Sequence, residues 1–171
     1  MRTLLIISSA LLLGACGEQA AEPPKAAAIP AKLPAGQYEV TTSVKSLVST
    51  DKTPVPTFTK VGETRTVTGC VSADGVPGVE LLATKDDACV VKDPYIRNGR
   101  MNLTLDCTRP AQGKVMATLD GKYTADGFTG TQTATSTFAG SGDFRLVEEL
   151  TARKLADQCS PAATGAAEAK S

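Results

Sequence analysis

Cysteine is the residue type that offers this chain its most evident chemistry. The sequence of 171 residues holds five cysteines and no histidine. Four of them, Cys70, Cys89, Cys107 and Cys159, are widely spaced and form no Cys-x-x-Cys pair, which argues against a zinc site and against thioredoxin-type redox chemistry. An even number of cysteines is typical of structural disulfides in chains that leave the cytoplasm. We therefore expect these four cysteines to form two disulfides.

Residues for nucleophilic or acid–base catalysis are few. Without histidine, neither a Ser-His-Asp nor a Cys-His arrangement can be built. Ser43 and Lys45 would share one face of a strand, but a solvated pair explains them better than Ser-Lys catalysis. Glu148 and Glu149 would point to opposite faces of a strand, so they cannot act as the carboxylate pair of a glycosidase. The chain is therefore not expected to be an enzyme.

Cofactor and nucleic-acid sites have equally little support. Asp86 and Asp87 lack the regular oxygen spacing of a calcium loop, and the sequence has no glycine-rich phosphate loop. Its 18 basic and 18 acidic residues are mixed along the chain, with no basic stripe. We expect no cofactor, no metal and no nucleic-acid partner.

The fifth cysteine, Cys16, follows a segment of another kind. After Met1 and Arg2, an apolar run ends at Leu13 and is too short to span a bilayer as a helix. Residues Leu13-Gly14-Ala15-Cys16 resemble the lipobox of bacterial lipoproteins. The resemblance implies that residues 1–15 are a signal peptide, that cleavage precedes Cys16, and that this cysteine is acylated on its thiol and new amino group. Two or three acyl chains make a membrane anchor effectively permanent.

The resemblance also predicts where the protein resides. Gly17 follows the modified cysteine, whereas enterobacterial lipoproteins kept at the inner membrane carry Asp at that place. We therefore expect attachment to the outer membrane, with the domain facing the periplasm. Residues 16–35 are rich in Pro and Ala and cannot bury enough apolar area to offset the entropy of ordering them, so they are predicted to form a tether. Residues 160–171 have the same character and are predicted to be a disordered tail.

Residues 36–159 show a different pattern, in which apolar and polar residues alternate. Alternation with period two is typical of antiparallel strands that have one face on a core and one face in water. Asn98-Gly99 is the preferred dipeptide of a two-residue hairpin turn. The predicted fold is mainly β, an antiparallel meander sheet that could curl toward a half-barrel. The inward residues of the first strand are expected to be Tyr38, Val40, Thr42, Val44 and Val48.

Three further segments have local features of their own. One short helix is predicted from about Gly78 to Thr84. Asp143 to Ala156 favours helix by propensity and strand by alternation, and both readings remain open. Five threonines would share one face of a strand, which predicts a solvent-facing surface or, alternatively, a partner-binding one. They are Thr129, Thr131, Thr133, Thr135 and Thr137.

The four cysteines allow three pairings. If Asn98-Gly99 closes a hairpin, Cys89 and Cys107 lie nearly opposite each other and differ by one residue from ideal register. A β-bulge or a three-residue loop would bring them into register. The preferred pairing is therefore Cys89 with Cys107, which leaves Cys70 with Cys159.

The order of these features resembles the domain of unknown function 3617 family, found in many exported proteobacterial proteins. The similarity runs from Leu33 to Cys159. It rests on a Leu-x-x-Gly turn before an aromatic strand, a cysteine followed by a helical stretch, a cysteine-bearing hairpin, a strand that starts near Tyr123, and a final cysteine. The resemblance implies a mostly antiparallel β-domain and carries no established activity.

Two functions fit these observations. The first is a non-enzymatic envelope module, held by the acyl chains on Cys16, that binds or supports another envelope component. The alternative is a carrier that holds a lipid or another apolar small ligand inside the curled sheet. The carrier predicts a cavity lined by Val40, Val44, Leu103, Leu105, Val115 and Leu119.

Overall fold

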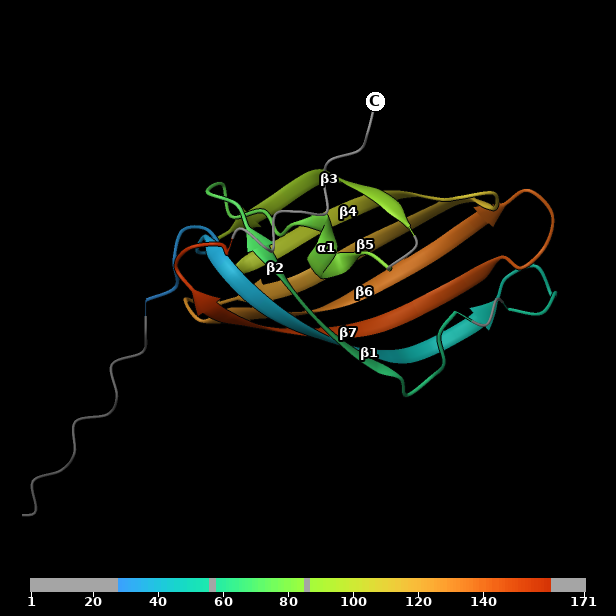
Figure 1. The fold of residues 1–171 in the computed structure, drawn as a ribbon, viewed down its shortest axis with the longest axis horizontal. Helices are drawn as coiled ribbons and strands as arrows, with labels where there is room; N and C mark the ends of the chain where they lie inside the picture. Colours follow the sequence, from blue (N-terminus) through green and yellow to red (C-terminus); the bar gives the residue numbers. More distant parts are fainter. Residues whose placement is uncertain (1–27, 56–57, 85–86, 161–171) are drawn as a thin grey trace, which may run out of the picture.

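The computed structural model describes residues 28–55, 58–84 and 87–160, which form one seven-stranded sheet and one short helix (Figure 1). The predicted helix is present but is a single turn. Within the described ranges, no helix has the length and hydropathy needed to cross a membrane. The elements are β1 (Gly36–Ser49), β2 (Thr64–Val71), α1 (Val79–Leu82), β3 (Ala88–Arg97), β4 (Arg100–Arg109), β5 (Gly113–Tyr123), β6 (Gly127–Phe138) and β7 (Phe144–Ala156).

The sheet is antiparallel throughout, with the strand order β2-β1-β7-β6-β5-β4-β3. Strands β3 to β7 follow one another as a meander. Strand β1 pairs with β7 at the end of this meander, and β2 then forms the edge next to β1. The predicted fold class, a mainly β meander curled into a half-barrel with one short helix and two disulfides, is confirmed.

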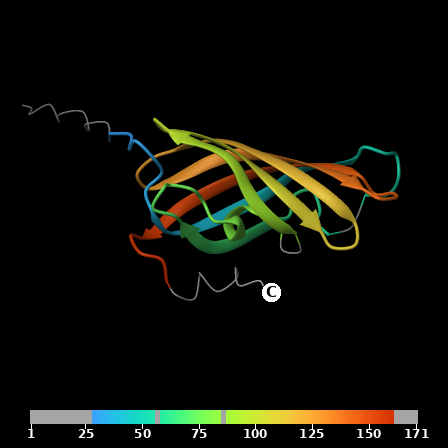
Figure 2. The ribbon, with the colours of Figure 1, turned by 90° about the horizontal axis from the view of Figure 1, so that it is seen from above.

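Helix α1 lies in the hollow of the curled sheet (Figures 1 and 2). It joins β2 to β3, which are the two opposite edges of the sheet, and it contacts both of them as well as β1. The approach to β2 is close because Gly69 has no side chain: a Cβ placed there would lie 2.6 Å from Cγ of Glu80. The helix therefore fills the gap that the half-barrel leaves between its edges.

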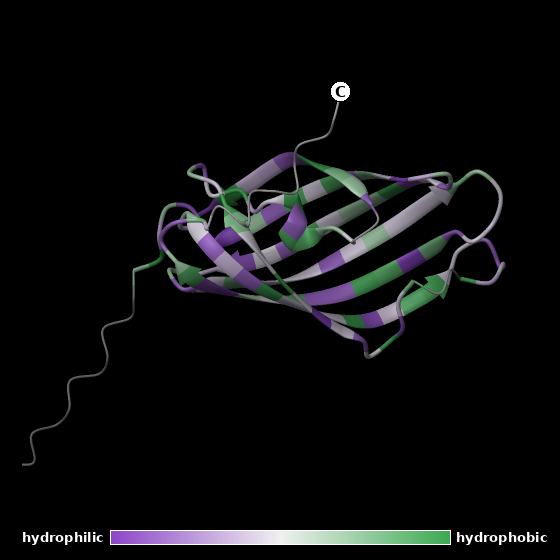
Figure 3. Ribbon diagram, in the orientation of Figure 1, coloured by the Kyte–Doolittle hydropathy of each residue, from purple (hydrophilic) through white to green (hydrophobic). Residues whose placement is uncertain are grey.

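Hydrophobic and hydrophilic residues alternate along the strands (Figure 3), and buried and exposed side chains alternate with them, so the two faces of the sheet differ in polarity. The concave face and α1 enclose the core. The convex face carries polar side chains. The largest fully buried side chains are Tyr38, Phe144, Leu33, Leu81, Leu82, Met101, Leu103, Leu105, Leu119, Leu146, Leu150 and Val40.

Strand β1 departs from the simple alternation that its sequence shows. Its pairing with β7 shifts between Val44 and Ser46, so one extra residue is inserted there. Beyond this irregularity Leu47 packs against the core, while Val48 is 49% exposed. The prediction that Val48 points inward is wrong, because a β-bulge reverses which residues face the core.

The ambiguous segment near the C-terminus is a strand. Phe144–Ala156 forms β7, which pairs with β1 on one side and with β6 on the other. Its Glu, Leu, Lys and Arg residues favour a helix by intrinsic propensity. The backbone hydrogen bonds to two neighbouring strands and the burial of its apolar face outweigh that propensity.

The disulfides join the cysteines in the preferred pairing. Asn98-Gly99 forms a two-residue turn between β3 and β4, and both residues have positive φ, as the preferred hairpin turn requires. An irregularity between Lys92 and Tyr95 then places Cys89 directly opposite Cys107. The second disulfide, Cys70–Cys159, connects residues 89 positions apart.

The packed part of the chain starts ahead of Gly36, the predicted domain boundary. Leu33 is fully buried in the core. The hydroxyl of Tyr123 donates to the carbonyl of Ala31 at 3.0 Å, and that of Tyr38 donates to the carbonyl of Pro34 at 2.8 Å. The end of the predicted tether is thus fixed to the domain. Residues 16–27 of the tether with Cys16, the signal peptide, and residues 161–171 of the tail lie outside the described residues.

Candidate ligand-binding site

A pocket of about 580 Å³ opens on the concave side, beside α1. This volume falls within the range of small-molecule sites. Apolar lining comes from four elements: Phe58 in the loop before β2, Val67 on β2, Val79 on α1 and Leu146 on β7. The remaining lining is mostly charged.

Glu148 is one of two buried carboxylates that line this pocket. It occupies an inward position of β7, where the alternation of the strand places it between Leu146 and Leu150, and the residue is 3% exposed. Burial raises the pKa of its carboxyl above the usual 4.5, and Arg65 and Gln132 offset part of this rise. As predicted, its neighbour Glu149 points to the other face, where it pairs with Lys45 at 2.7 Å.

The contacts of Glu148 are long for a buried carboxylate. Nε of Arg65 lies 3.9 Å from Oε1 of Glu148, and Nε2 of Gln132 donates to Oε2 at 3.4 Å. The shorter bonds of both partners go to α1 instead. Arg65 donates to the carbonyl of Ala83 at 2.9 Å, and Gln132 donates to that of Leu82 at 3.1 Å. These bonds satisfy carbonyls at the end of the helix, which has no basic residue in its last turn.

Two more polar atoms of the concave face lack partners. Oγ1 of Thr42 and Oε1 of Gln132 are buried and form no hydrogen bond. Gln132 is directly opposite Glu148 in the β6–β7 register, and Val44, two residues beyond Thr42, is opposite Glu148 in the β1–β7 register. Buried polar atoms without partners are uncommon in folded proteins and often mark a site that a ligand or water completes.

Asp87, at the other side of the pocket, is a buried carboxylate with a close partner. Arg109 donates to both its oxygens, at 2.6 and 2.8 Å. The guanidinium carbon of Arg109 also lies over the ring of Phe58, 4.2 Å from its centroid, and near the rings of Phe138 and Phe144. This ion pair among aromatic rings closes one wall of the pocket.

The other residues considered for catalysis form no catalytic arrangement among the described residues. Ser43 and Lys45 share the convex face, as predicted, but the ammonium of Lys45 is paired with Glu149. Asp86 lies outside the described residues. Among the residues that the structure describes, no three His, Cys, Asp or Glu side chains are grouped so as to hold a metal ion.

The cavity that a carrier would need does not form at the predicted place. The six side chains expected to line it are packed in the core, each at most 4% exposed. The pocket beside α1 has other lining residues. Sequence reasoning missed this pocket, because its walls come from a loop, a short helix and strands that are distant in the chain.

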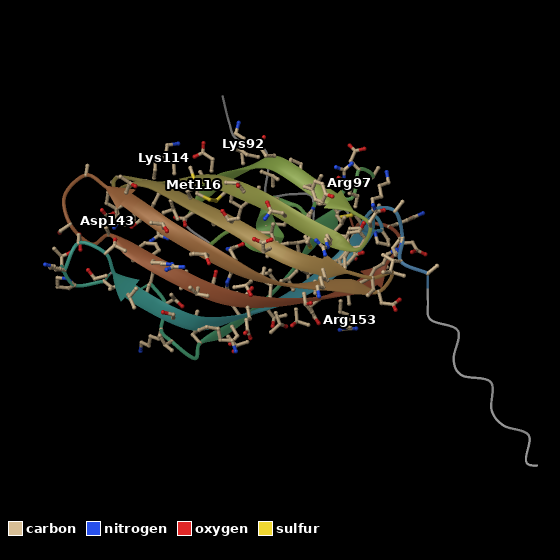
Figure 4. All side chains as sticks on the ribbon, turned by 180° about the vertical axis from the view of Figure 1, so that it is seen from behind. Lys92, Arg97, Lys114, Met116, Asp143 and Arg153 are labelled. Carbon is tan, nitrogen blue, oxygen red and sulfur yellow. A yellow bond between two sulfur atoms is a disulfide. The ribbon has the colours of Figure 1, made fainter. Side chains whose placement is uncertain are left out.

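The threonines of β6 lie on the convex face, and four of the five are exposed, as the sequence predicts; Thr133 is half-buried. They are not confined to one strand. Thr129 is in register with Thr151, which is in register with Thr41, and Thr41 in turn with Thr66, so that threonines line up across β6, β7, β1 and β2. Figure 4 shows the convex face, with Met116 and Arg153 among its labelled side chains.

Comparison with known proteins places the domain in a family. No curated protein and no solved structure matches the chain. A family model described as a protein of unknown function (DUF3617) matches residues 33–159, from the first buried leucine to the last cysteine of the domain. The match covers most of the sequence, and the chain therefore belongs to the DUF3617 family.

Proposed function

We propose that this protein is a lipid-anchored, non-enzymatic module of the bacterial envelope that binds a small ligand on the concave side of its domain. The pocket beside α1 is the observation that carries the binding part, because it combines a suitable volume, apolar walls and a buried carboxylate. The anchor part is supported by Leu13-Gly14-Ala15-Cys16, and its outer-membrane location by Gly17. Two disulfides support a domain outside the cytoplasm, since disulfides persist in oxidising compartments.

The anchor is tested by metabolic labelling with an alkyne-bearing fatty acid in a bacterial host. The wild-type protein is expected to carry the label and to sediment with outer membranes. The Cys16→Ser variant should lose the label and keep its signal peptide, because the thiol is the acyl acceptor. Label that persists in Cys16→Ser would contradict this assignment of the anchor.

Ligand binding is tested on a soluble secreted form, in which Ser replaces Cys16 and an ordinary signal peptide replaces residues 1–15. Native mass spectrometry should detect a bound small molecule on the protein released from the periplasm. Val67→Trp should reduce the bound fraction, because the new ring fills the pocket. Val90→Trp is the matched control, since Val90 is 51% exposed on β3 and lies outside the lining. Equal retention by both variants would contradict binding in this pocket.

A second candidate function uses the convex face. The threonines aligned across four strands offer an exposed polar surface, and a hydroxyl surface costs little to desolvate when a partner donates and accepts hydrogen bonds. An envelope protein is the partner that the location favours. Crosslinking in the intact envelope, followed by mass spectrometry, tests this: crosslinks from Lys45 and Lys114 to one protein would support it, and none from either would contradict it.

A further inference from the structure

We propose that the ligand of the pocket is an amphiphilic organic cation, whose ammonium group pairs with Glu148 and whose apolar part contacts Phe58, Val67, Val79 and Leu146. This inference rests on the proposed function, because it names the ligand class of the same site. It follows from the charge of the lining, from the long contacts of the buried Glu148 carboxylate, and from the position of the apolar walls.

The lining is acidic. Four carboxylates, those of Glu63, Glu80, Asp87 and Glu148, line the pocket together with one guanidinium, that of Arg65. Arg109 neutralises Asp87 in the wall, and the carboxylates still outnumber the guanidinium groups, four to two. A concave site lined by one sign of charge raises the local concentration of ions of the opposite sign. The pocket therefore favours a cation over an anion.

Three of the four carboxylates are already engaged by the protein. Asp87 holds Arg109 through both oxygens. Glu80 accepts from the backbone N–H of Cys70 at 3.0 Å, and Glu63 accepts from the backbone N–H of Lys60 at 2.9 Å. Glu148 differs from these three. Its nearest partners are the amide of Gln132 at 3.4 Å and the guanidinium of Arg65 at 3.9 Å.

Arg65 does not compensate Glu148 fully. At 3.9 Å the pair is at the outer limit of an ion pair, and the guanidinium is held by the carbonyl of Ala83 at 2.9 Å. A buried carboxylate normally needs close donors, because desolvation disfavours its charge. A ligand ammonium would supply three N–H donors and a full positive charge at the place where the protein supplies neither at short range.

One unpartnered oxygen beside Glu148 fits the same kind of ligand. Oε1 of Gln132, on the strand paired with β7, can only accept a hydrogen bond, and it is buried without a donor. Gln132 lies behind the pocket lining, directly opposite Glu148 in the strand register. An ammonium bound at Glu148 brings donors to this side of the sheet, whereas an anion brings only acceptors.

The apolar side chains of the pocket favour a ligand that has an apolar part beside its ammonium group. Phe58, Val67, Val79 and Leu146 come from four different elements and leave a volume of about 580 Å³ together with the charged residues. Apolar contact of this kind contributes roughly 25 cal/mol per Å² of buried surface. A small inorganic cation would leave these walls uncovered, whereas an alkyl or aryl amine covers them.

Another role is open to Glu148, namely to position Arg65 and Gln132 so that they bind the end of α1. That role and ligand binding make different predictions. If Glu148 only positions other side chains, its substitution changes stability, and the pocket does not distinguish ligands by charge. If Glu148 pairs with the ligand, its substitution removes the preference for a cationic ligand.

Isothermal titration of the secreted form with three eight-carbon probes separates these cases. Octylammonium, octanol and octanoate share one chain and differ in head group. We expect octylammonium to bind about ten- to a hundredfold more tightly than the other two, which is the size of one charge-assisted hydrogen-bonded pair. Glu148→Gln should abolish this preference. Glu149→Gln is the matched control, because it neutralises the next residue on the opposite, exposed face of β7.

If octanol or octanoate binds as tightly as octylammonium, or if the preference survives Glu148→Gln, the cationic ligand is overturned and the proposed pocket still stands. Failure of all three probes to bind counts against the pocket itself, and so against the proposed function. If Glu148→Gln does not fold, NMR chemical shifts of the backbone amides of the wild-type protein, measured with and without octylammonium, locate the binding site. Octylammonium must then perturb residues around Glu148 and Val67, and shifts confined to Thr129 and Thr151 on the convex face would overturn the proposal.

Discussion

Asp87 and Glu148 are both buried carboxylates, with side chains 3% and 4% exposed, but they differ in how closely their partners approach. Asp87 has a bidentate Arg109 among aromatic rings. Glu148 has only distant partners and a raised pKa. The first arrangement is what a stable structural ion pair needs. The second costs stability, and residues that cost stability are typical of binding sites.

Glu148→Gln is expected to stabilise the ligand-free domain at neutral pH. The folded-state pKa of Glu148 is raised, so the wild-type protein is relatively most stable below the unfolded value of 4.5 and loses stability as pH rises through the folded value. The amide carries no charge and avoids this loss. Urea unfolding at several pH values should show a gain for the variant at pH 7 that shrinks toward pH 4. A gain of the same size at both pH values would contradict a raised pKa.

Arg109→Met is expected to destabilise the domain by about 3 to 5 kcal/mol, because it leaves Asp87 buried without a partner. Asp87→Leu should also destabilise the domain, because it leaves the guanidinium of Arg109 buried without a partner. The double variant removes both charges and should be more stable than the sum of the two single losses predicts. Urea unfolding of all four proteins gives the coupling energy directly. Additive losses would mean that the ion pair contributes nothing of its own.

The sequence allowed these residues to be identified only in part. The absence of histidine and the separation of Glu148 from Glu149 followed from residue type and alternation. The roles of Gln132 and Glu148 did not, although both interrupt inward apolar series, because their strands had first to be aligned with each other. Residues that meet only through register cannot be paired from a single strand pattern.

At the scale of elements, local signals located most strands and turns. Period two and Asn98-Gly99 were sufficient for the β3–β4 hairpin. They were not sufficient for the bulge in β1, which exposes Val48, or for the assignment of β7. A bulge leaves composition unchanged, and the strand state of β7 depends on neighbours that lie far away in the chain.

Gly99→Ala is expected to destabilise the domain by about 1 to 2 kcal/mol. The φ angle at this position is +77°, and in that conformation the Cβ of alanine lies too close to the backbone. The new Cβ would also approach Ile29, with 2.9 Å to its Cγ2. Gly62→Ala is the control, because φ there is +86° and nothing lies within 4 Å. Thermal unfolding should show a loss for both and a larger one for Gly99→Ala. A neutral Gly99→Ala would contradict the assigned turn.

At the scale of the whole molecule, the domain is a half-barrel whose opposite edges both contact α1. The family match begins at Leu33 and ends at Cys159, which are the first buried leucine and the last disulfide-bonded residue. The disulfides act over different distances. Cys89–Cys107 joins neighbouring strands of one hairpin, whereas Cys70–Cys159 joins β2 to the segment that follows β7, across β1.

Removal of Cys70–Cys159 is therefore expected to cost more than removal of Cys89–Cys107. The sequence separations are 89 and 18 residues, and the loop entropy of the unfolded chain then gives losses of about 4.5 and about 3 kcal/mol. Urea unfolding of the paired Cys→Ser variants measures both. The long-range disulfide also holds the segment after β7 beside β1, where Cys159 contacts the carbonyl of Gly36. Its loss should thus expose β1 and β2 amides to hydrogen exchange while β4 and β5 stay protected. Equal costs, or exchange spread evenly over the sheet, would mean that the half-barrel is held by its core alone.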